Sequence, residues 1–553
     1  MAEAGDATDL PTERNHNQHS AWRVAIVISS LCLGILLFGL DVNILGTAIP
    51  RITTDFHSLA DVSWYGSAYL LTVTAFQPLF GNLYKYFNAK VVYLASLVVF
   101  EVGSIVCAVA PSSPVLIFAR ALLGFGAAGL LQGALAIIRF VVPPNKVPLF
   151  QGVVVSALGI SVAIGPVIGG SLTQFVSWRW CFWINVPIGA FVIIVVSLFV
   201  PNQQSHNESE RKLPLRSKLQ HMDFLGIILF IGSISSLLLA LTWGGQTYPW
   251  NNSKIIGLFI GFGLLAIVLC FWLWKRGDVA LIPFRVLKKR SISMGALVLF
   301  FLGISGQIYA FYLPIFFQSV QGVSTTQSGV QYIALVVPQI VSLVVTGGFV
   351  STWGFYYPYL VSGVSIATVG AGLLTTVGPL TPTVKWAAFM VITGIGTGMA
   401  QQLPYTAVQA VLDSVDVPTG NAIAVFSYQL GGALGLAIGQ NLLIGKLRMA
   451  VPAYTDAVSP DLVITAGASG LSDISPTPSV LNALRLAYNA AIHDTLILAL
   501  AATALSVLPS LAMERLNIKT IANDRSGVAV VAEKKSPAEV RVSQSQLSNE
   551  DSR

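Results

Sequence analysis

The stretch VAIVISSLCLGILLFGLDVNILG, residues 24–46, decides the fold class. A helix rises about 1.5 Å per residue, so this nearly uninterrupted apolar run is long enough to cross the roughly 30 Å hydrocarbon core of a bilayer. A strand of a membrane barrel needs only about 9–11 residues of alternating character. The run, with Asp41 as its one charged residue, therefore predicts a membrane-spanning helix.

Similar apolar runs recur along the whole chain, and fourteen of them are candidate spans. They lie approximately at residues 24–46, 61–81, 91–110, 115–139, 149–171, 181–200, 223–242, 255–274, 293–317, 328–350, 357–377, 385–406, 421–443 and 492–512. Hydrophobic residues occupy 54% of the 553 positions and charged residues 10%, which excludes a string of soluble domains. The chain is therefore predicted to be an all-α polytopic membrane protein.

The charged and metal-binding residue types exclude several other functions. The net charge of +7 comes from basic residues between apolar runs, where topology explains them, so nucleic-acid binding is not expected. The four cysteines lie in apolar runs without CxxC spacing, and the six histidines do not cluster. No phosphate-binding loop, catalytic triad or haem motif occurs. We therefore expect no metal, no cofactor and no enzyme activity.

Loops rich in Lys and Arg stay on the cytoplasmic side of the membrane, so the distribution of these residues predicts the orientation of the chain in the bilayer. With a cytoplasmic N-terminus, the inner loops carry fourteen of these residues and the outer loops carry seven. Both termini are therefore predicted to be cytoplasmic. Residues 1–20 are polar and have no basic n-region or cleavage site, so no signal peptide is expected. The plasma membrane is the expected location, with the vacuolar membrane as the alternative.

Three ionisable residues lie well inside predicted spans: Asp41, Arg120 and Glu101. A charged side chain inside the bilayer costs free energy, so such residues are candidates for a functional role. Asp41 and Arg120 each lie about five residues from the outer ends of their spans, roughly 7–8 Å deep, so they can pair if the helices are neighbours. Such a pair is either a proton-coupling element or a structural staple. Glu101 lies near the bilayer centre without an obvious partner.

The run GPVIGG at 165–170 places Gly165, Pro166, Gly169 and Gly170 in one predicted span. Proline removes a backbone donor, and glycines let a neighbouring helix approach closely, so the span can bend there. Tight helix packing alone is the simpler alternative.

This run resembles the antiporter motif in helix 5 of the major facilitator superfamily, which is associated with exporters. Three further segments resemble motifs of its fourteen-spanner drug:proton antiporters: LDVNILGTAIP at 40–50, RALLGFGAAG at 120–129 and SWRWCFWINVPIG at 177–189. FEVGS at 100–104 and QAVLD at 409–413 are similar to segments of fungal toxin and multidrug efflux pumps. In the family's helix 4 motif the arginine, here Arg120, is implicated in proton transfer.

Three positions depart from the family pattern. In GNLYKYFNAK at 81–90, Lys85 stands where an aspartate is usual and Asn88 where a glycine is usual. Leu123 replaces a frequent glutamine of the helix 4 motif. The charge pair that gates the family's cytoplasmic side is therefore not expected in its usual form.

The resemblance implies a major facilitator fold, in which two six-helix bundles enclose the transport route. The fourteen transmembrane helices then divide as 6+2+6, with one pair inserted between the bundles. The expected parts are a cytoplasmic tail at 1–23, a first bundle at 24–200, basic linkers with the inserted pair at 201–292, a second bundle at 293–512 with a long outside loop at 445–489, and a disordered cytoplasmic tail at 513–553.

Amide and phenol side chains within the spans are candidates for lining the substrate route. A mostly apolar pocket with a few polar groups suits uncharged, moderately lipophilic compounds. The candidates are Tyr69, Gln77, Gln307, Tyr309, Tyr312, Gln331, Gln339 and Gln429.

These features and the resemblance favour a proton-coupled exporter of small toxic compounds, drugs or secondary metabolites that works by alternating access. The expected partners are the transported compound, protons and the lipid bilayer, and the protein is expected to be monomeric. The alternative is an importer of a nutrient or iron chelate from the same superfamily. A membrane enzyme is disfavoured, because the spans contain no cluster of His, Asp or Cys.

The charge distribution predicts which side of the membrane each loop faces. A reporter fused after Arg553 and a reporter inserted within 459–479 are expected on opposite sides. Paired reporters, one active only in the cytoplasm and one active only outside it, check this arrangement. Both positions on the same side would contradict the topology.

Overall fold

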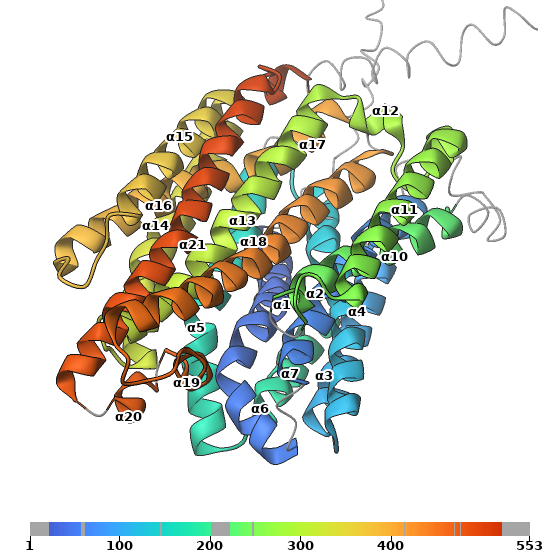
Figure 1. Cartoon of the computed structure of the whole chain (residues 1–553). Helices are drawn as coiled ribbons and strands as arrows, with labels where there is room; N and C mark the ends of the chain where they lie inside the picture. The colour runs from blue at the N-terminus through green and yellow to red at the C-terminus, as the bar shows by residue number, and fades with distance from the viewer. Residues whose placement is uncertain are drawn as a thin grey trace, which may run out of the picture.

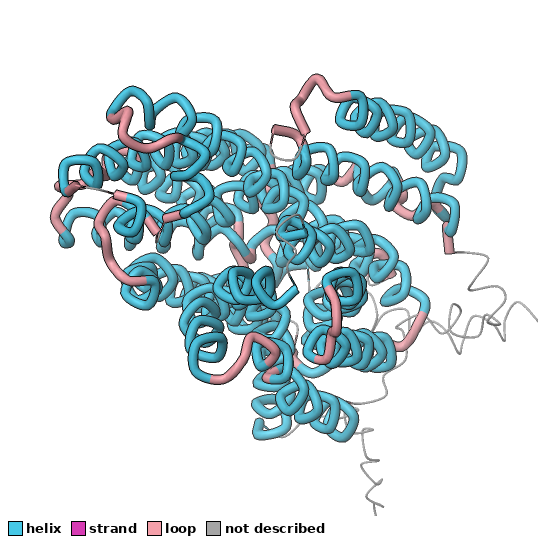
Figure 2. Tube along the Cα trace, turned by 60° about the horizontal axis from the view of Figure 1, so that its bottom comes forward, coloured by secondary structure: helices cyan, strands magenta, loops and turns pink. Residues whose placement is uncertain are grey.

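The computed structural model describes residues 21–56, 61–143, 146–200, 222–245, 248–413, 415–468, 470–475 and 477–521. These residues are helical apart from turns and two isolated β-bridges (Figures 1 and 2). The first helices are α1 (Ala21–Phe56), α2 (Val62–Tyr86), α3 (Ala89–Ala108), α4 (Ser113–Val141), α5 (Val147–Phe175), α6 (Trp180–Trp183) and α7 (Asn185–Phe199). Next come α10 (Phe224–Trp243), α11 (Ser253–Arg276), the 3-10 helix η3 (Gly277–Val279) and α12 (Phe284–Leu287). The last are α13 (Arg290–Ser319), α14 (Thr325–Trp353), α15 (Tyr357–Leu374), α16 (Thr383–Gln401), α17 (Leu403–Val411), α18 (Val417–Tyr454), α19 (Pro460–Ala466), α20 (Leu471–Ile474) and α21 (Pro478–Ala512).

The predicted all-α membrane fold is confirmed. Every predicted span coincides with a helix, except that 181–200 forms α6 and α7, and 385–406 extends over α16 and α17. Among the described helices, eleven are long and apolar enough to cross a membrane, and α5 adds a twelfth if its two segments, bent by 44°, form one span. The helices α2 and α16–α17 are richer in polar and small residues, so the count of fourteen stays a prediction.

The segment 445–489, expected as a long outside loop, is mostly helical. It contains the end of α18, all of α19 and α20, and the start of α21. Ser459 and Thr477 begin α19 and α21, and each side-chain oxygen accepts a hydrogen bond from a backbone N–H of the first turn. These capping residues explain why helix continues in a stretch that apolar run length assigns to a loop.

The start of the C-terminal tail is also better defined than expected. Tyr356 donates a hydrogen bond of 2.7 Å to the carbonyl of Glu514, and the Ile518 N–H donates one of 2.9 Å to the carbonyl of Gly354. Residues 513–521 are thereby held against the turn between α14 and α15. The expected disorder at 522–553, like the tail at 1–20, lies outside the described residues.

Helices pack closely within each half of the chain (Figure 1). In the first half α1 packs along α5, and α4 packs against α2 and α3; in the second, α13 packs against α18 and α21, and α16 against α14 and α15. Glycines permit this close approach of neighbouring helices. A Cβ on Gly126 would meet the backbone of Phe100, and a Cβ on Gly396 would meet the backbone of Ala367.

The pair α10 and α11, green in Figure 1, lies on the outside of the bundle against α2 and α18. The ring of Phe230 lies 5.0 Å from that of Phe426 on α18, and the ring of Trp243 lies 5.4 Å from that of Trp64 on α2. The inserted pair therefore contacts both halves. The other face of α11 is apolar and exposed, which is the composition expected of a surface against lipid chains.

Close helix packing predicts a difference between two glycines. Gly396→Leu is expected to destabilise the protein by about 1–3 kcal/mol or more, because the new side chain must displace the backbone of α15. Gly263→Leu on α11 is the control, since a Cβ there meets no atom within 4 Å. Thermal unfolding in detergent and the yield of monodisperse protein measure the effect. Equal midpoints for the two variants would contradict the packing.

Candidate functional site

The two charges predicted to pair, Asp41 on α1 and Arg120 on α4, form a buried ion pair. Arg120 donates from Nη1 to Asp41 Oδ2, and from Nε to the carbonyl of Tyr65 at 2.8 Å. The Asp41 side chain is 0% exposed and the Arg120 side chain is 1% exposed. The second carboxylate oxygen of Asp41 has no hydrogen-bond partner among the described residues. The site thus contains a compensated charge pair with one oxygen left to accept a proton.

Tyr69 belongs to this pair rather than to the substrate cavity described below. The centroid of its ring lies 4.6 Å from the guanidinium carbon of Arg120, which is within the range of a cation–π contact. Its hydroxyl donates to the carbonyl of Phe38 on α1 at 3.2 Å. Tyr69 therefore links α2 to both helices that carry the charges.

Glu101 on α3 lies apart from the pair, and no hydrogen bond or ion pair joins it to Asp41 or Arg120. It is 7% exposed, and neither carboxylate oxygen has a hydrogen-bond partner among the described residues. Its carboxylate lies against Gly189 of α7, where a Cβ would collide with it. One turn along, Asn185 donates to Ser104 at 2.9 Å, so this α3–α7 contact is polar.

The glycines of the GPVIGG run lie on α5 beside α1. The helix bends by 44° between Val147–Val162 and Val167–Phe175. A Cβ on Gly165 would meet Asn43, two residues from Asp41, whereas a Cβ on Gly170 would meet nothing within 4 Å. The Gly169 carbonyl accepts from the Cys181 thiol at 3.9 Å. The side chain of Pro166 lies outside the described residues.

A partly open cavity lies between the two halves, and its volume, counted together with the open solvent at its mouth, is about 730 Å³. Its lining comes from α5 in the first half and from α13, α14, α16 and α18 in the second, and three of the predicted residues are part of it: Gln307, Tyr309 and Gln339. Gln339 donates to Gln401 Oε1 at 2.9 Å. The described lining contains no Asp, Glu, Lys or Arg. The cavity therefore offers amides, phenols and apolar surface, but no fixed charge.

Four other predicted lining residues lie elsewhere. Gln132 Nε2 donates to the backbone carbonyl oxygen of Gln77 and to its side-chain Oε1, and this contact joins α4 to α2. The Tyr312 hydroxyl lies 3.4 Å from Gln440 Oε1, which joins α13 to α18. Gln331 and Gln429 are half-buried and do not line the cavity.

The cavity includes polar and aromatic residues that were not predicted, among them Ser156, Tyr332, Thr397 and Tyr428. Tyr332 could have been found, because it shares a face of α14 with Gln339 at a spacing of seven residues, two turns of helix. The others stand in apolar or glycine-rich sequence without a comparable stripe.

Comparisons with known proteins agree with this geometry. The model of the Major Facilitator Superfamily matches residues 31–436. The chain is 41% identical over 505 residues to the MFS-type efflux pump MFS1 of Arthroderma benhamiae, covering 91% of this chain and 93% of that protein. It is 37% identical over 526 residues to the efflux pump roqT of Penicillium rubens, covering 94% and 97%.

Solved structures share the fold. The proton:xylose symporter XylE aligns with a TM-score of 0.58 at 15% identity, covering 88% of this chain and 95% of that one. A bacterial homolog of the lysosomal transporter Spinster, in an inward-facing conformation, aligns with a TM-score of 0.54 at 17% identity, covering 89% and 98%. The family match and the efflux-pump relatives confirm the resemblance drawn from the motifs, and the chain belongs to the Major Facilitator Superfamily of membrane transporters.

Proposed function

We propose that this protein is a proton-coupled exporter of small, uncharged organic compounds that works by alternating access between its two halves. The observation that carries the proposal is the separation of two sites. A fully buried ion pair lies on α1 and α4, while a cavity without charged lining residues lies between α5 and the second half. The efflux-pump relatives support the direction of transport.

The ion pair is suited to taking up and releasing a proton. Protonation neutralises Asp41 and removes the charge that holds Arg120, while Arg120 keeps its contacts with Tyr65 and the ring of Tyr69. Deprotonation restores the pair, so the two states differ in how tightly α1 and α4 are joined. The membrane potential contributes about 2.3 kcal/mol per charge per 100 mV to any step that moves net charge.

Helix α5 connects this pair to the cavity. On one side a Cβ at Gly39 would meet Ser161, and Gly165 packs against Asn43, so α5 follows the part of α1 that carries Asp41. On its other side Ser156, Gly159 and Val162 line the cavity. A shift of α1 against α4 therefore reaches the cavity wall through a single packed helix.

The cavity chemistry indicates the class of compound. Hydrogen-bonding groups without charge are provided by Gln307, Gln339 and Gln401, and phenol rings by Tyr309 and Tyr332. Such a lining orients a moderately lipophilic molecule through a few polar contacts and gives a charged molecule no counter-charge. We place Glu101 of α3 as a third member of the proton-sensitive group, since it is buried and its carboxylate has no hydrogen-bond partner in the part of the chain that the structure describes.

The ion pair predicts a specific loss of coupling. Asp41→Asn is expected to abolish uphill efflux and its dependence on external pH, because the group that exchanges the proton is gone. Arg120→Lys keeps the charge but loses the planar fork, so it is expected to impair transport less than Arg120→Ala. The measurement is pH-driven efflux from vesicles, expressed per molecule of folded protein.

A purely structural pair predicts a different result. Asp41→Asn and Arg120→Ala would then each lower the amount of folded protein, and the double variant would partly recover it, because no buried charge is left unpaired. Full coupled transport by Asp41→Asn would remove the pair from the mechanism.

The cavity predicts a change in affinity without a change in coupling. Gln339→Leu removes a hydrogen-bonding group that contributes about 0.5–1.5 kcal/mol, so affinity for a transported compound is expected to fall about two- to tenfold. Gln429→Leu, on a half-buried glutamine away from the lining, is the matched control. Concentration dependence of efflux gives both values. Equal affinities in the two variants would place the substrate site elsewhere.

A further inference from the structure

Contacts between the two halves gather at the end of the molecule that carries the α2–α3 turn. A Cβ on Gly81 of α2 would meet Ala422 of α18, and the Leu149 N–H of α5 donates to Ser351 Oγ of α14 at 3.3 Å. Thr406 of α17 donates to Gln151 Oε1 of α5, also at 3.3 Å. The cavity is therefore closed at this end, which the topology predicts to be cytoplasmic.

A cluster of three charges lies within this closed end, and we call it the Asp416 cluster. Lys85 Nζ, near the end of α2, lies 3.5 Å from Asp416 Oδ1, at the start of α18. Arg285 Nη1, on α12, lies 2.8 Å from Asp416 Oδ2. The Lys85 and Asp416 side chains are only 8% and 4% exposed. The first half, the second half and the inserted segment thus each contribute one charge.

The polarity of the cluster is consistent with helix electrostatics. Asp416 is the N-cap residue of α18, where a negative charge interacts favourably with the helix dipole. A cation on α2 is then the complementary partner, which accounts for a lysine at the position where a carboxylate would repel Asp416. Because Lys85 and Arg285 both face the nearly buried Asp416 carboxylate, its charge stays compensated if one of these contacts is broken.

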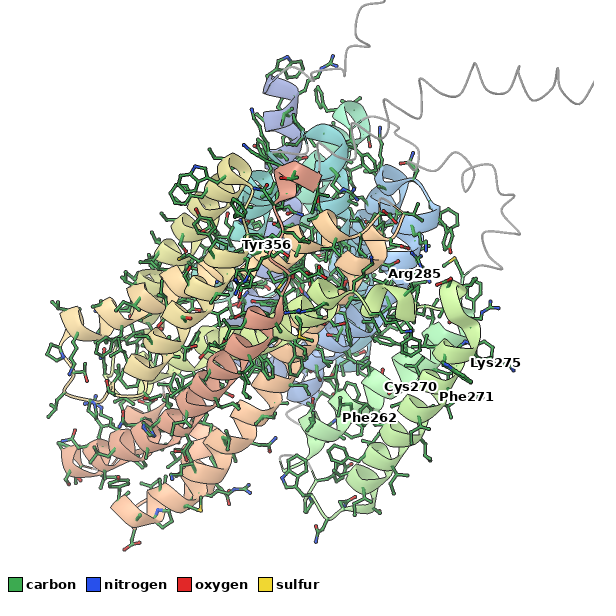
Figure 3. All side chains as sticks on the ribbon, turned by 90° about the horizontal axis from the view of Figure 1, so that it is seen from above. Phe262, Cys270, Phe271, Lys275, Arg285 and Tyr356 are labelled. Atoms are coloured by element: carbon green, nitrogen blue, oxygen red, sulfur yellow. The ribbon has the colours of Figure 1, made fainter. Side chains whose placement is uncertain are left out.

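The inserted segment holds Arg285 in place. Asp223, at the start of α10, accepts from Trp272 Nε1 of α11 at 2.7 Å and from the backbone N–H of Leu281 at 3.0 Å. Arg285 Nε donates to Asp278 Oδ1 of η3 at 3.3 Å, and Val286, next to Arg285, is buried in the core formed mostly by the first half. Viewed from above in Figure 3, Arg285 lies nearer the centre of the molecule than Lys275 of α11. Arg285 is therefore anchored by the inserted segment and by the first half, while its guanidinium reaches Asp416 of the second half.

We propose that the inserted helix pair is part of the device that locks this end, because Arg285 shares Asp416 with Lys85 across the junction of the two halves. Opening this end requires α18 to part from α2, which breaks the Lys85 contact within a poorly solvated site. Arg285 then stays with Asp416 or is left on the inserted segment. The inserted segment thus supplies a second cation to Asp416, and its contact with the second half is one that opening of this end must break or carry along.

Thiol labelling tests the lock without any transport reaction. In a background with all four native cysteines replaced, Ser156→Cys places a thiol in the wall of the cavity. A membrane-impermeant maleimide is applied to vesicles from the side of the α2–α3 turn, and the rate of labelling is measured per folded molecule. Arg285→Ala is expected to raise this rate several-fold. Lys288→Ala, an exposed lysine of the same linker, is the control and is expected to leave it unchanged.

Charge exchange provides the second arm of the test. Lys85→Asp is expected to raise labelling, because two carboxylates then face each other at the junction of the halves. Lys85→Arg keeps the positive charge opposite Asp416, so it is the matched control and is expected to keep labelling slow. Equal rates for Arg285→Ala and Lys288→Ala would overturn the proposal, and so would a failure of Lys85→Asp to open this end. Because no substrate or proton gradient is used, these outcomes are independent of whether Asp41 couples transport to protons.

Discussion

The structure depends on the need to compensate charge where water is absent. Asp41 and Arg120 are both fully buried, and removing one partner of such a pair costs about 3–5 kcal/mol, because the other charge is left alone in a poorly polarisable medium. The arrangement of α1, α2 and α4 follows from this requirement. Tyr69 and the carbonyl of Tyr65 complete the surroundings of the guanidinium, so three helices share one charged centre. A proton on Asp41 changes the balance for all three.

The same constraint separates the charged groups from the cavity, and in the proposed mechanism this separates proton coupling from substrate binding. Charges concentrate on α1 and α4 and at the helix ends around Asp416, while the cavity lining is uncharged. The cavity therefore presents amides and phenols to a compound that enters it, and on the proposed mechanism the charged groups respond to that compound only through packed helices. Helix α5 lies between the ion pair and the cavity, and Gly165 lets α1 lie close to it, which is the contact that the proposed mechanism uses.

Local physics explains which features could be predicted from the sequence. Apolar runs predicted the helices, and the equal depths of Asp41 and Arg120 predicted that they could meet, because both depend only on rise per residue and on the cost of burying charge. The Lys85–Asp416 contact could not be predicted, since it joins helices far apart in the chain. Likewise, Tyr428 lines the cavity through the rotation of α18, which the sequence around it leaves open, whereas the spacing of Tyr332 from Gln339 on α14 was a usable signal.

The uneven lining of the cavity has an evolutionary consequence. Most of its wall comes from the second half, whereas the ion pair lies entirely in the first. Under the proposed mechanism, substitutions on α13, α14, α16 and α18 can therefore alter which molecules are accepted while the proposed proton-coupling pair stays intact. On that proposal, a duplicated gene can be adapted to a new compound by changes in one half, so a change of cargo does not require a new coupling site.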